Sequence, residues 1–166
     1  MSNYGKLVLF CGKMGSGKTT KAVELTAEMG GILISEDEWL AKLYPEEINS
    51  FSDYIKYSGR LKSIVKAHVQ SILGVGISVV MDFPGNTKKQ RSWLKEIFEE
   101  KQFSHSLIYL EADDQVCLKR LESRRRSQPE RAKFDNEEVF KQVTAYFEPP
   151  SLEEGFNIEI IKQSNT

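Results

Sequence analysis

A glycine-rich turn at residues 12–19 constrains the fold of this chain more than any other sequence feature. An apolar, β-favouring run, Leu7 to Cys11, precedes the turn, and helix-like sequence begins near Lys18. The turn fits the spacing G-x-x-x-x-G-K-[ST], with Gly12, Gly17, Lys18 and Thr19 at the fixed positions. A turn without a ligand is the weaker interpretation, because the motif and its strand–turn–helix context agree. We therefore predict that the chain binds a nucleoside triphosphate.

Each fixed position of this phosphate loop has a physical role. Glycines let consecutive backbone N–H groups surround an anion that a Cβ atom would keep away. The following helix adds unpaired N–H groups and the positive end of its dipole. Lys18 can reach the outer phosphates, and the Thr19 hydroxyl can bind the accompanying Mg2+. The expected cofactors are ATP and Mg2+, although no motif separates adenine from guanine. The expected nucleotide-binding residues are Gly12, Lys13, Met14, Gly15, Ser16, Gly17, Lys18, Thr19 and Thr20.

Length and composition are those of an ordinary globular protein. With 166 residues, 40% of them hydrophobic and 28% charged, the chain suits one domain, residues 1–166, with its own core. A net charge of −1 argues against broad non-specific binding to nucleic acid. Cys11 and Cys117 are too few and too far apart for a zinc site, so we expect reduced core thiols. No segment resembles a signal peptide or reaches membrane-spanning length, which favours a cytoplasmic protein without membrane contact.

Strand-like and helix-like segments alternate along the chain. The strand-like runs are Leu7 to Cys11, Ile32 to Ile34, Ile77 to Met81, Leu107 to Leu110 and Ile158 to Ile161. Helical spacing is found at 18–29, 38–43 and 60–73, after Thr87, after Asp113, and from a capping-box-like pair, Asp135 and Glu138. The stretch between Pro45 and Gly59 is too irregular to assign. This alternation predicts an α/β fold with a parallel sheet covered by helices on both faces.

Two aspartates follow apolar strands, at the strand ends where open α/β sheets bind ligands. Asp37 follows Ile32 to Ile34, and we predict that it accepts the proton of a substrate hydroxyl attacking the γ-phosphate. It is an equally good N-cap for the short helix from Glu38 to Leu43, and the two roles are compatible. Asp82 ends the most apolar strand and is a candidate contact for Mg2+ or the acceptor, because a charge there needs a partner. The alternative for Asp82 is a plain turn residue.

A basic segment in the last third of the chain suggests a flap over the phosphates. Arg120 and Arg124 are four residues apart and share a helix face, and Arg125 and Arg126 follow. The polar stretch 127–133 lacks periodicity, so we interpret about 125–134 as a short mobile lid. Its basic residues would neutralise charge that develops during phosphoryl transfer. A solvated charge run and a nucleic-acid patch are the alternatives.

Five segments carry a family resemblance that spans nearly the whole chain. They are GKMGSGKTT, the DEW after Ile34, VVMDFPGNTKKQR, LKRLESRRR and FEPPSLEEGF. The pattern resembles the small P-loop kinases of the adenylate-kinase-like group. Within it, the chain looks most like an AAA-type ATP-binding branch with polynucleotide 5′-hydroxyl kinases and zeta-toxin-like or antibiotic phosphotransferases. The first segment is highly specific for triphosphate binding, and the others mainly fix the branch.

The resemblance implies a three-layer fold with five parallel strands in the order 2-3-1-4-5. It also implies Asp37 as base, Asp82 near the acceptor or metal, and Arg120 and Arg124 as lid arginines on the phosphates. Met14 stands where this branch often has proline, which should change loop stiffness but not phosphate binding. Leu40 stands where polynucleotide kinases place an arginine for the 3′-phosphate of the substrate, which weakens the case for a nucleic-acid acceptor.

The sequence thus predicts ATP- and Mg2+-dependent phosphoryl transfer to a hydroxyl group of a small molecule. The expected catalytic residues are Lys18, Asp37, Arg120 and Arg124, and the expected metal site contains Thr19 and Asp82. The alternatives are a polynucleotide 5′-hydroxyl kinase and an ATP-binding switch or ATPase without an acceptor. The sequence identifies neither the acceptor nor the oligomeric state.

Overall fold

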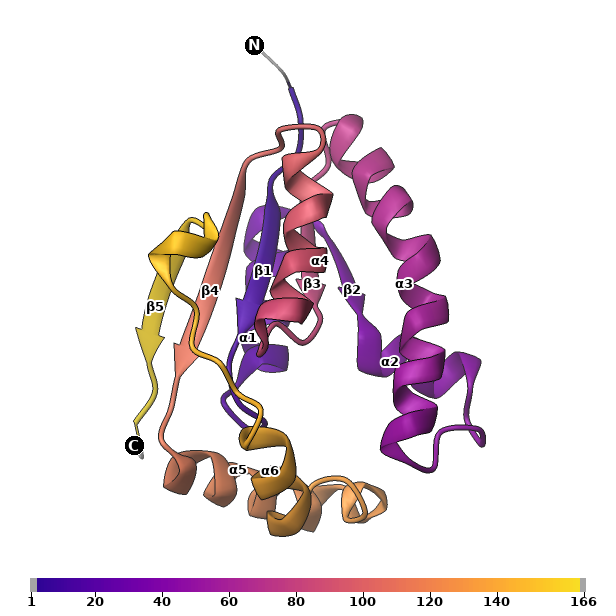
Figure 1. Cartoon of the computed structure of the whole chain (residues 1–166), viewed down its shortest axis with the longest axis vertical. Coiled ribbons are helices and arrows are strands. Elements are labelled where there is room, and N and C mark those ends of the chain that lie inside the picture. Colours follow the sequence, from indigo (N-terminus) through magenta and orange to yellow (C-terminus); the bar gives the residue numbers. More distant parts are fainter. Residues whose placement is uncertain (1–2, 165–166) are drawn as a thin grey trace.

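The computed structural model describes residues 3–164 as a sheet flanked by helices (Figure 1). The strands within these residues are β1 (Leu7–Cys11), β2 (Ile32–Ser35), β3 (Val79–Asp82), β4 (His105–Glu111) and β5 (Ile158–Lys162). The α-helices are α1 (Lys18–Met29), α2 (Glu36–Leu43), α3 (Phe51–Gly74), α4 (Lys88–Glu99), α5 (Asp114–Ser127) and α6 (Glu137–Thr144). Short 3-10 turns lie at Pro129–Arg131 and Leu152–Glu154.

The strands form one parallel sheet in the order β2-β3-β1-β4-β5. The first strand of the sequence therefore lies in the middle, where Leu7 pairs with Val79 of β3 on one side and His105 of β4 on the other. This confirms both the predicted parallel sheet and its predicted order. All strands end at the same edge, which Figure 1 shows at the bottom together with α2, α5 and α6.

The core is divided between the two faces of the sheet. Alternate residues of β1 point to opposite sides, as the pleat of a strand requires. Leu7, Leu9 and Cys11 pack in the larger cluster with residues of α3 and α4. Val8 and Phe10 pack on the other face with residues of α1. Because helices cover both faces, every residue of β1 is buried, which explains its uninterrupted apolar sequence.

Helix α3 begins nine residues before the predicted start at residue 60. Its N-cap is Ser50, whose hydroxyl accepts a hydrogen bond from the Asp53 amide at 3.1 Å. The first turns of α3 expose Phe51 and Ile55 and bury the polar Ser58, so the usual apolar spacing is absent there. The spacing becomes regular only from Leu61, which is where the sequence pattern first indicated a helix.

Two predicted helix caps are wrong. Helix α2 starts at Glu36 rather than Glu38, and the hydroxyl of Ser35 caps it by accepting from the Glu38 amide at 3.3 Å. Asp37 therefore lies inside the first turn and is not the N-cap. Helix α6 is capped by Asn136, whose side chain accepts from the Val139 amide at 2.9 Å, and not by Asp135.

Two other caps are confirmed. The Thr87 hydroxyl and the Gln90 side chain form a reciprocal capping box at the start of α4. Asp113 caps α5 by accepting from the Val116 amide at 2.9 Å. Strand β3 starts at Val79 rather than Ile77, because the Ile77 amide donates to the Ile72 carbonyl and still belongs to the turn that ends α3.

Cys11 and Cys117 are both buried and free, as expected. Within residues 3–164, none of the helices combines the length and the apolar character that a membrane span requires.

Candidate functional site

The loop between β1 and α1 has the backbone that an anion-binding turn requires. Gly15 and Gly17 have φ values of 76° and 98°, in the left-handed region that favours glycine. A Cβ atom on Gly15 would lie 2.6 Å from the Cys117 carbonyl oxygen, so the loop needs glycine at this position. Gly17 is the N-cap of α1 and offers no side chain to the first-turn amides. These amides are therefore available to a bound anion.

Lys18 closes the loop on itself. Its ammonium group donates to the Gly12 carbonyl oxygen, and burial lowers its pKa against the opposing effects of Asp82 and Asp37. The Gly12 amide donates to Asn86 Oδ1 at 2.9 Å, so Gly12 is fixed by the protein itself. The Ser16 hydroxyl is buried and has no hydrogen-bond partner in the described part of the chain. Such an orphaned group is uncommon, and it fits a loop that a polar ligand completes.

The remaining loop residues differ in their surroundings. Lys13 forms an ion pair with Asp114 at 2.8 Å. Met14 packs against the small apolar cluster of α5 and α6, and Thr20 is exposed on α1. Met14 is therefore an anchor of the loop, Lys13 is engaged by Asp114, and Thr20 is accessible to a ligand.

The predicted acidic residues lie close to the loop. Thr19 Oγ1 donates to Asp82 Oδ2 at 2.8 Å. Burial raises the pKa of Asp82, and the Thr19 hydroxyl and the Lys18 ammonium oppose this shift. Ser35 pairs with Asp82 in the sheet, and Asp37 follows Ser35 by two residues in the first turn of α2; its charge also acts on the pKa of Lys18 and of Asp82. The ends of β2 and β3 thus bring Asp37 and Asp82 together beside the phosphate loop, where Asp37 is exposed to an incoming ligand.

The oxygen atoms of Thr19 and Asp82 are suitable ligands for Mg2+. The described residues contain no group of three or more His, Cys, Asp or Glu side chains arranged to hold a metal. Mg2+ commonly uses one or two protein oxygens and completes its shell with phosphate and water. The donor set therefore fits Mg2+ bound together with a nucleotide better than a dedicated metal cage.

Sequence reasoning missed Glu36, the acid next to Asp37. Its side chain is buried and accepts hydrogen bonds from the Tyr54 hydroxyl and, at 2.8 Å, from the Ser58 hydroxyl. Burial raises its pKa, and these two hydrogen bonds oppose the shift. Glu36 thereby joins the start of α2 to α3. Its partners come from the stretch that sequence patterns left unassigned, so no local signal separated it from Asp37.

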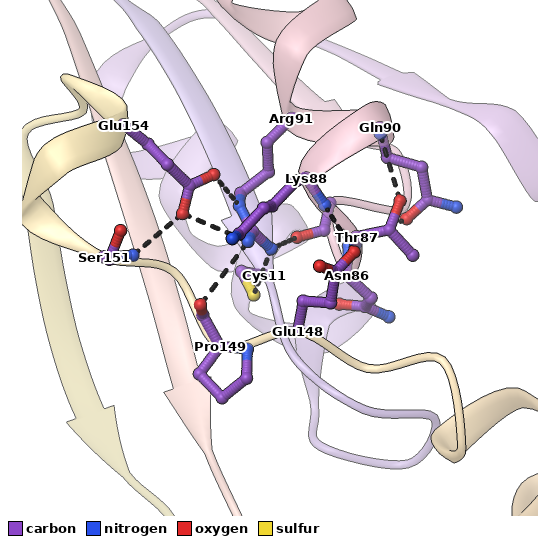
Figure 2. A network of polar contacts seen from close by, with 11 residues as sticks. Cys11, Asn86, Thr87, Lys88, Gln90, Arg91, Glu148, Pro149, Ser151 and Glu154 are labelled. Carbon is purple, nitrogen blue, oxygen red and sulfur yellow. Dashed lines mark hydrogen bonds and ion pairs between the residues drawn. The ribbon is translucent and has the colours of Figure 1, made fainter.

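A second network that sequence reasoning missed contacts the loop through Asn86 and is centred on Arg91 (Figure 2). Arg91 of α4 is fully buried and binds Glu154 through Nε at 2.7 Å and Nη2 at 3.2 Å, while Nη1 donates to the Gly85 carbonyl at 2.9 Å. Asn86, the partner of Gly12, also accepts through its carbonyl from the Glu148 amide at 2.8 Å. The loop is thus held by a segment near the C-terminal end of the described chain. The sequence segments GNTKKQR and FEPPSLEEGF contain these residues but did not reveal their pairing.

The arginines of α5 have different partners. Arg120 donates from Nη1 to the Ser16 carbonyl at 3.0 Å, so it touches the phosphate loop directly. Arg124 binds the buried Asp135 at 2.6 Å and 2.7 Å, and Arg131 binds the same carboxylate at 2.7 Å. Burial disfavours the charged form of Asp135, but the bonds from both arginines outweigh it and hold its pKa below the ordinary value. The predicted capping acid of α6 is therefore the anchor of two arginines.

Arg131 and Arg126 have partners of different kinds. Burial opposes the charged form of Arg131, but its bond to Asp135 outweighs this effect and raises its pKa, and the charge of Asp37 adds to the shift. Arg126 instead pairs with Glu122 on the surface of α5, away from the loop residues. Within the predicted lid, Arg131 is thus held by the buried Asp135, whereas Arg126 is held by a neighbour on its own helix.

Residues 7–150 match the family model of an AAA domain. The chain belongs to this AAA domain family. No curated protein matches the sequence significantly.

Three solved structures show how widely this AAA domain shares its fold. A sugar kinase from Janibacter is 18% identical, with a TM-score of 0.65 over 95% of this chain and 85% of that one. Kti12 from Chaetomium thermophilum, solved with ADP-AlF3, is 16% identical, with a TM-score of 0.70 over 96% and 90%. The APS kinase CysC from Mycobacterium tuberculosis, solved with AMPPNP and APS, is 16% identical, with a TM-score of 0.62 over 98% and 91%. The chain therefore shares its fold with these three structures.

Proposed function

We propose that this AAA domain is an ATP- and Mg2+-dependent kinase that transfers the γ-phosphate to a hydroxyl group of a small molecule. The observation that carries the proposal is the cluster of Lys18, Thr19, Asp82 and Asp37 at one sheet edge. It combines a phosphate-binding cation, an oxygen pair for Mg2+ and an exposed carboxylate that can serve as a base.

Each group has a distinct role in this proposal. The loop amides and Lys18 hold the β- and γ-phosphates. Thr19 and Asp82 hold Mg2+, which when bound neutralises charge on the phosphate oxygens. Asp37 accepts the proton of the attacking hydroxyl, while Arg120 and Arg124, on or beside a lid at about 125–134, stabilise the transferring group. Because the protein forms no bond with the phosphoryl group, catalysis rests on positioning and electrostatics.

Two of the similar structures support the proposal that the nucleotide is ATP and that the reaction is phosphoryl transfer. Kti12 was solved with ADP-AlF3, and the APS kinase was solved with AMPPNP and APS. Both of these structures of the same fold thus contain an adenine nucleotide or an analogue of one, and the second contains APS as well. A nucleic-acid 5′ end is the second candidate acceptor. Leu40, at the position of the phosphate-binding arginine of polynucleotide kinases, is buried in the core, which argues against it.

The decisive experiment combines transfer and binding. Labelled ATP is incubated with the protein and a panel of hydroxyl-bearing metabolites, antibiotics and 5′-hydroxyl oligonucleotides, and Mg·ATP binding is measured by calorimetry. We expect Lys18→Ala to lower turnover by about 1000-fold, as loss of an electrostatic stabiliser does. We expect Asp37→Asn to bind Mg·ATP normally and to lose roughly 100-fold or more in transfer.

Glu38→Gln is the matched control for Asp37→Asn, because Glu38 lies on the same helix turn but pairs with Lys42 at the surface. It should leave transfer unchanged. Full activity of Asp37→Asn would refute the base assignment. Absence of any heat with Mg·ATP would refute the kinase proposal, and acceptor-independent hydrolysis alone would favour an ATPase or switch.

A further inference from the structure

One face of α3 carries a polar side chain at every fourth position: Tyr54, Ser58, Lys62 and Lys66. Tyr54 and Ser58 donate to the buried carboxylate of Glu36. Lys66 binds Glu96 at 3.1 Å and also binds Glu100 on α4. Lys62 lies between these contacts, and no hydrogen bond or ion pair joins it to any residue in 3–164. Lys62 is therefore the one side chain of these four without a hydrogen-bond or ion-pair partner among the described residues.

The surroundings of Lys62 make an unpaired ammonium group costly. Its Nζ atom lies 5.1 Å from the centre of the Trp93 ring, and its side chain is half-buried. Burial lowers its pKa, Glu36 opposes this shift, and Lys89 adds to it. A partly dehydrated cation normally has an anionic partner, and a ring face offsets only part of the loss. Glu36 is near, but both of its oxygens already accept from Tyr54 and Ser58.

Trp93 links Lys62 and Lys89 to the end of β3. Its ring lies under Lys62, it follows Lys89 by one turn of α4, and it packs against Phe83, the residue after Asp82. The charge of Glu36 acts on the pKa of Lys62, and Glu36 directly precedes Asp37, the proposed base, in the sequence. Lys89 lies in the first turn of α4, a few residues after Asp82, and it too has no ion pair within the described residues. The two ammonium groups come from different helices and repel each other, so an anion between them would relieve the repulsion. Lys18 and the first-turn amides of α1 are already available for the nucleotide, so these lysines can serve a second anion.

We propose that Lys62, assisted by Lys89, binds an anionic substituent of the acceptor, namely a phosphate, sulfate or carboxylate group. This inference rests on the proposed function and narrows it, because the acceptor becomes an acidic hydroxyl compound and not a neutral one. Lys62 is a specificity residue in this scheme, since it touches the acceptor away from the hydroxyl that reacts. The competing explanation is that Lys62 only balances the charge of Glu36.

Direct binding tests the subsite without requiring turnover. The chain has two tryptophans, so Trp39→Phe leaves Trp93 as the fluorescent reporter beneath Lys62. With Mg·AMPPNP added to occupy the phosphate loop, this protein is titrated with sulfate, glycerol 3-phosphate, glycerate and glycerol at constant ionic strength. We expect a saturable change with at least one anion and none with glycerol. Adding Lys62→Met should weaken the anion affinity at least tenfold.

Two further variants separate charge from packing. Lys66→Met removes the next lysine of the same row, which is already paired, and should leave the anion affinity within twofold. Lys62→Arg keeps the charge and should retain most of the affinity. The subsite is refuted if the anions give no saturable change, or if the Lys62→Met and Lys66→Met proteins bind them equally. Circular dichroism of each variant confirms that the comparison is made on folded protein.

A kinetic arm distinguishes failure of this inference from failure of the proposed function. Transfer from labelled ATP is measured with matched acceptors that differ only in an anionic group: glycerol, glycerate and glycerol 3-phosphate, and ribose and ribose 5-phosphate. We expect higher kcat/KM for anionic members and loss of that preference in Lys62→Met. Transfer without such preference refutes the subsite alone. Absence of nucleotide binding refutes the kinase, while the titration without AMPPNP still reports on Lys62.

Discussion

Two buried ion-pair clusters flank the phosphate loop, and they differ in which partner is buried. In the first, Arg91 is fully buried, while the side chain of its partner Glu154 is 15% exposed. In the second, Asp135 is buried, and the side chains of Arg124 and Arg131 are 33% and 34% exposed. The first cluster hides its cation, and the second presents two cations to solvent.

This difference decides what each cluster can do. All three guanidinium nitrogens of Arg91 donate to protein atoms, so it has little capacity left for a ligand. Arg131 uses only Nε toward Asp135, and Arg124 uses Nε and Nη2. Their remaining N–H groups can bind phosphate oxygens. We infer that the Arg91 cluster maintains structure, whereas the Asp135 cluster positions arginines for a ligand.

The largest expected effect is on stability and comes from Glu154→Leu. This change leaves the buried Arg91 guanidinium without its counter-ion, which should lower the free energy of unfolding by about 3–5 kcal/mol. Urea unfolding of the purified protein measures the loss. Glu153→Leu, at the exposed neighbouring position, is the control and should change stability by less than about 0.5 kcal/mol. Equal effects at the two positions would mean that the Arg91 cluster is not a structural support.

A smaller effect, on catalysis, is expected from Arg124→Gln and Arg131→Gln. Each variant removes a cation proposed to neutralise charge in the transferring phosphoryl group, so kcat should fall by roughly 100-fold, or about 2.7 kcal/mol. Steady-state kinetics with saturating ATP measure it. Arg126→Gln removes an arginine of the same helix that pairs with Glu122 and should leave kcat within twofold. If all three variants behave alike, the exposed arginines do not contact the phosphates.

The smallest effect is expected from Asp135→Asn, which keeps both arginines but loosens their anchor. We expect kcat to fall by about tenfold and stability to fall by about 1–3 kcal/mol at neutral pH. Because the pKa of Asp135 is lowered in the folded state, its contribution is present above the unfolded value of about 3.9 and is lost as pH falls through the folded value.

The wild type and Asp135→Asn should therefore approach equal stability in acid. Urea unfolding between about pH 3 and 7 measures this convergence. A constant difference in stability over this range would show that the carboxylate charge of Asp135 is not what holds the two arginines.

Features encoded by local patterns could be predicted from the sequence. The apolar run of β1, the glycines of the loop and the Thr87 cap depend on neighbouring residues, and the structure confirms the corresponding elements. The sheet order came from the family resemblance and is also confirmed. Local patterns fail where the partner lies far along the chain, as for Arg91 and Glu154.

The acids illustrate the same limit within one helix turn. Glu36 and Asp37 are adjacent and chemically alike, yet α2 buries the first against α3 and leaves the second exposed. Which of the two faces the ligand depends on the helix start, and the sequence pattern placed that start two residues late. Asp135 was similarly assigned to a cap because its partners, Arg124 and Arg131, belong to a segment without periodicity.

The hydrogen bonds that join Asn86 to Gly12 and to Glu148 have a consequence for synthesis on the ribosome. The nucleotide-binding motif leaves the exit tunnel early, whereas Asn86, which fixes its first amide, and Glu148 and Glu154, which belong to the supporting network, are made much later. We expect a nascent chain to carry the complete motif without binding nucleotide until Glu154 has emerged, so ribosome-bound chains stalled before and after Glu154 should differ in their retention on immobilised ATP. Nucleotide binding would then begin only when residues 148–154 dock beside the loop.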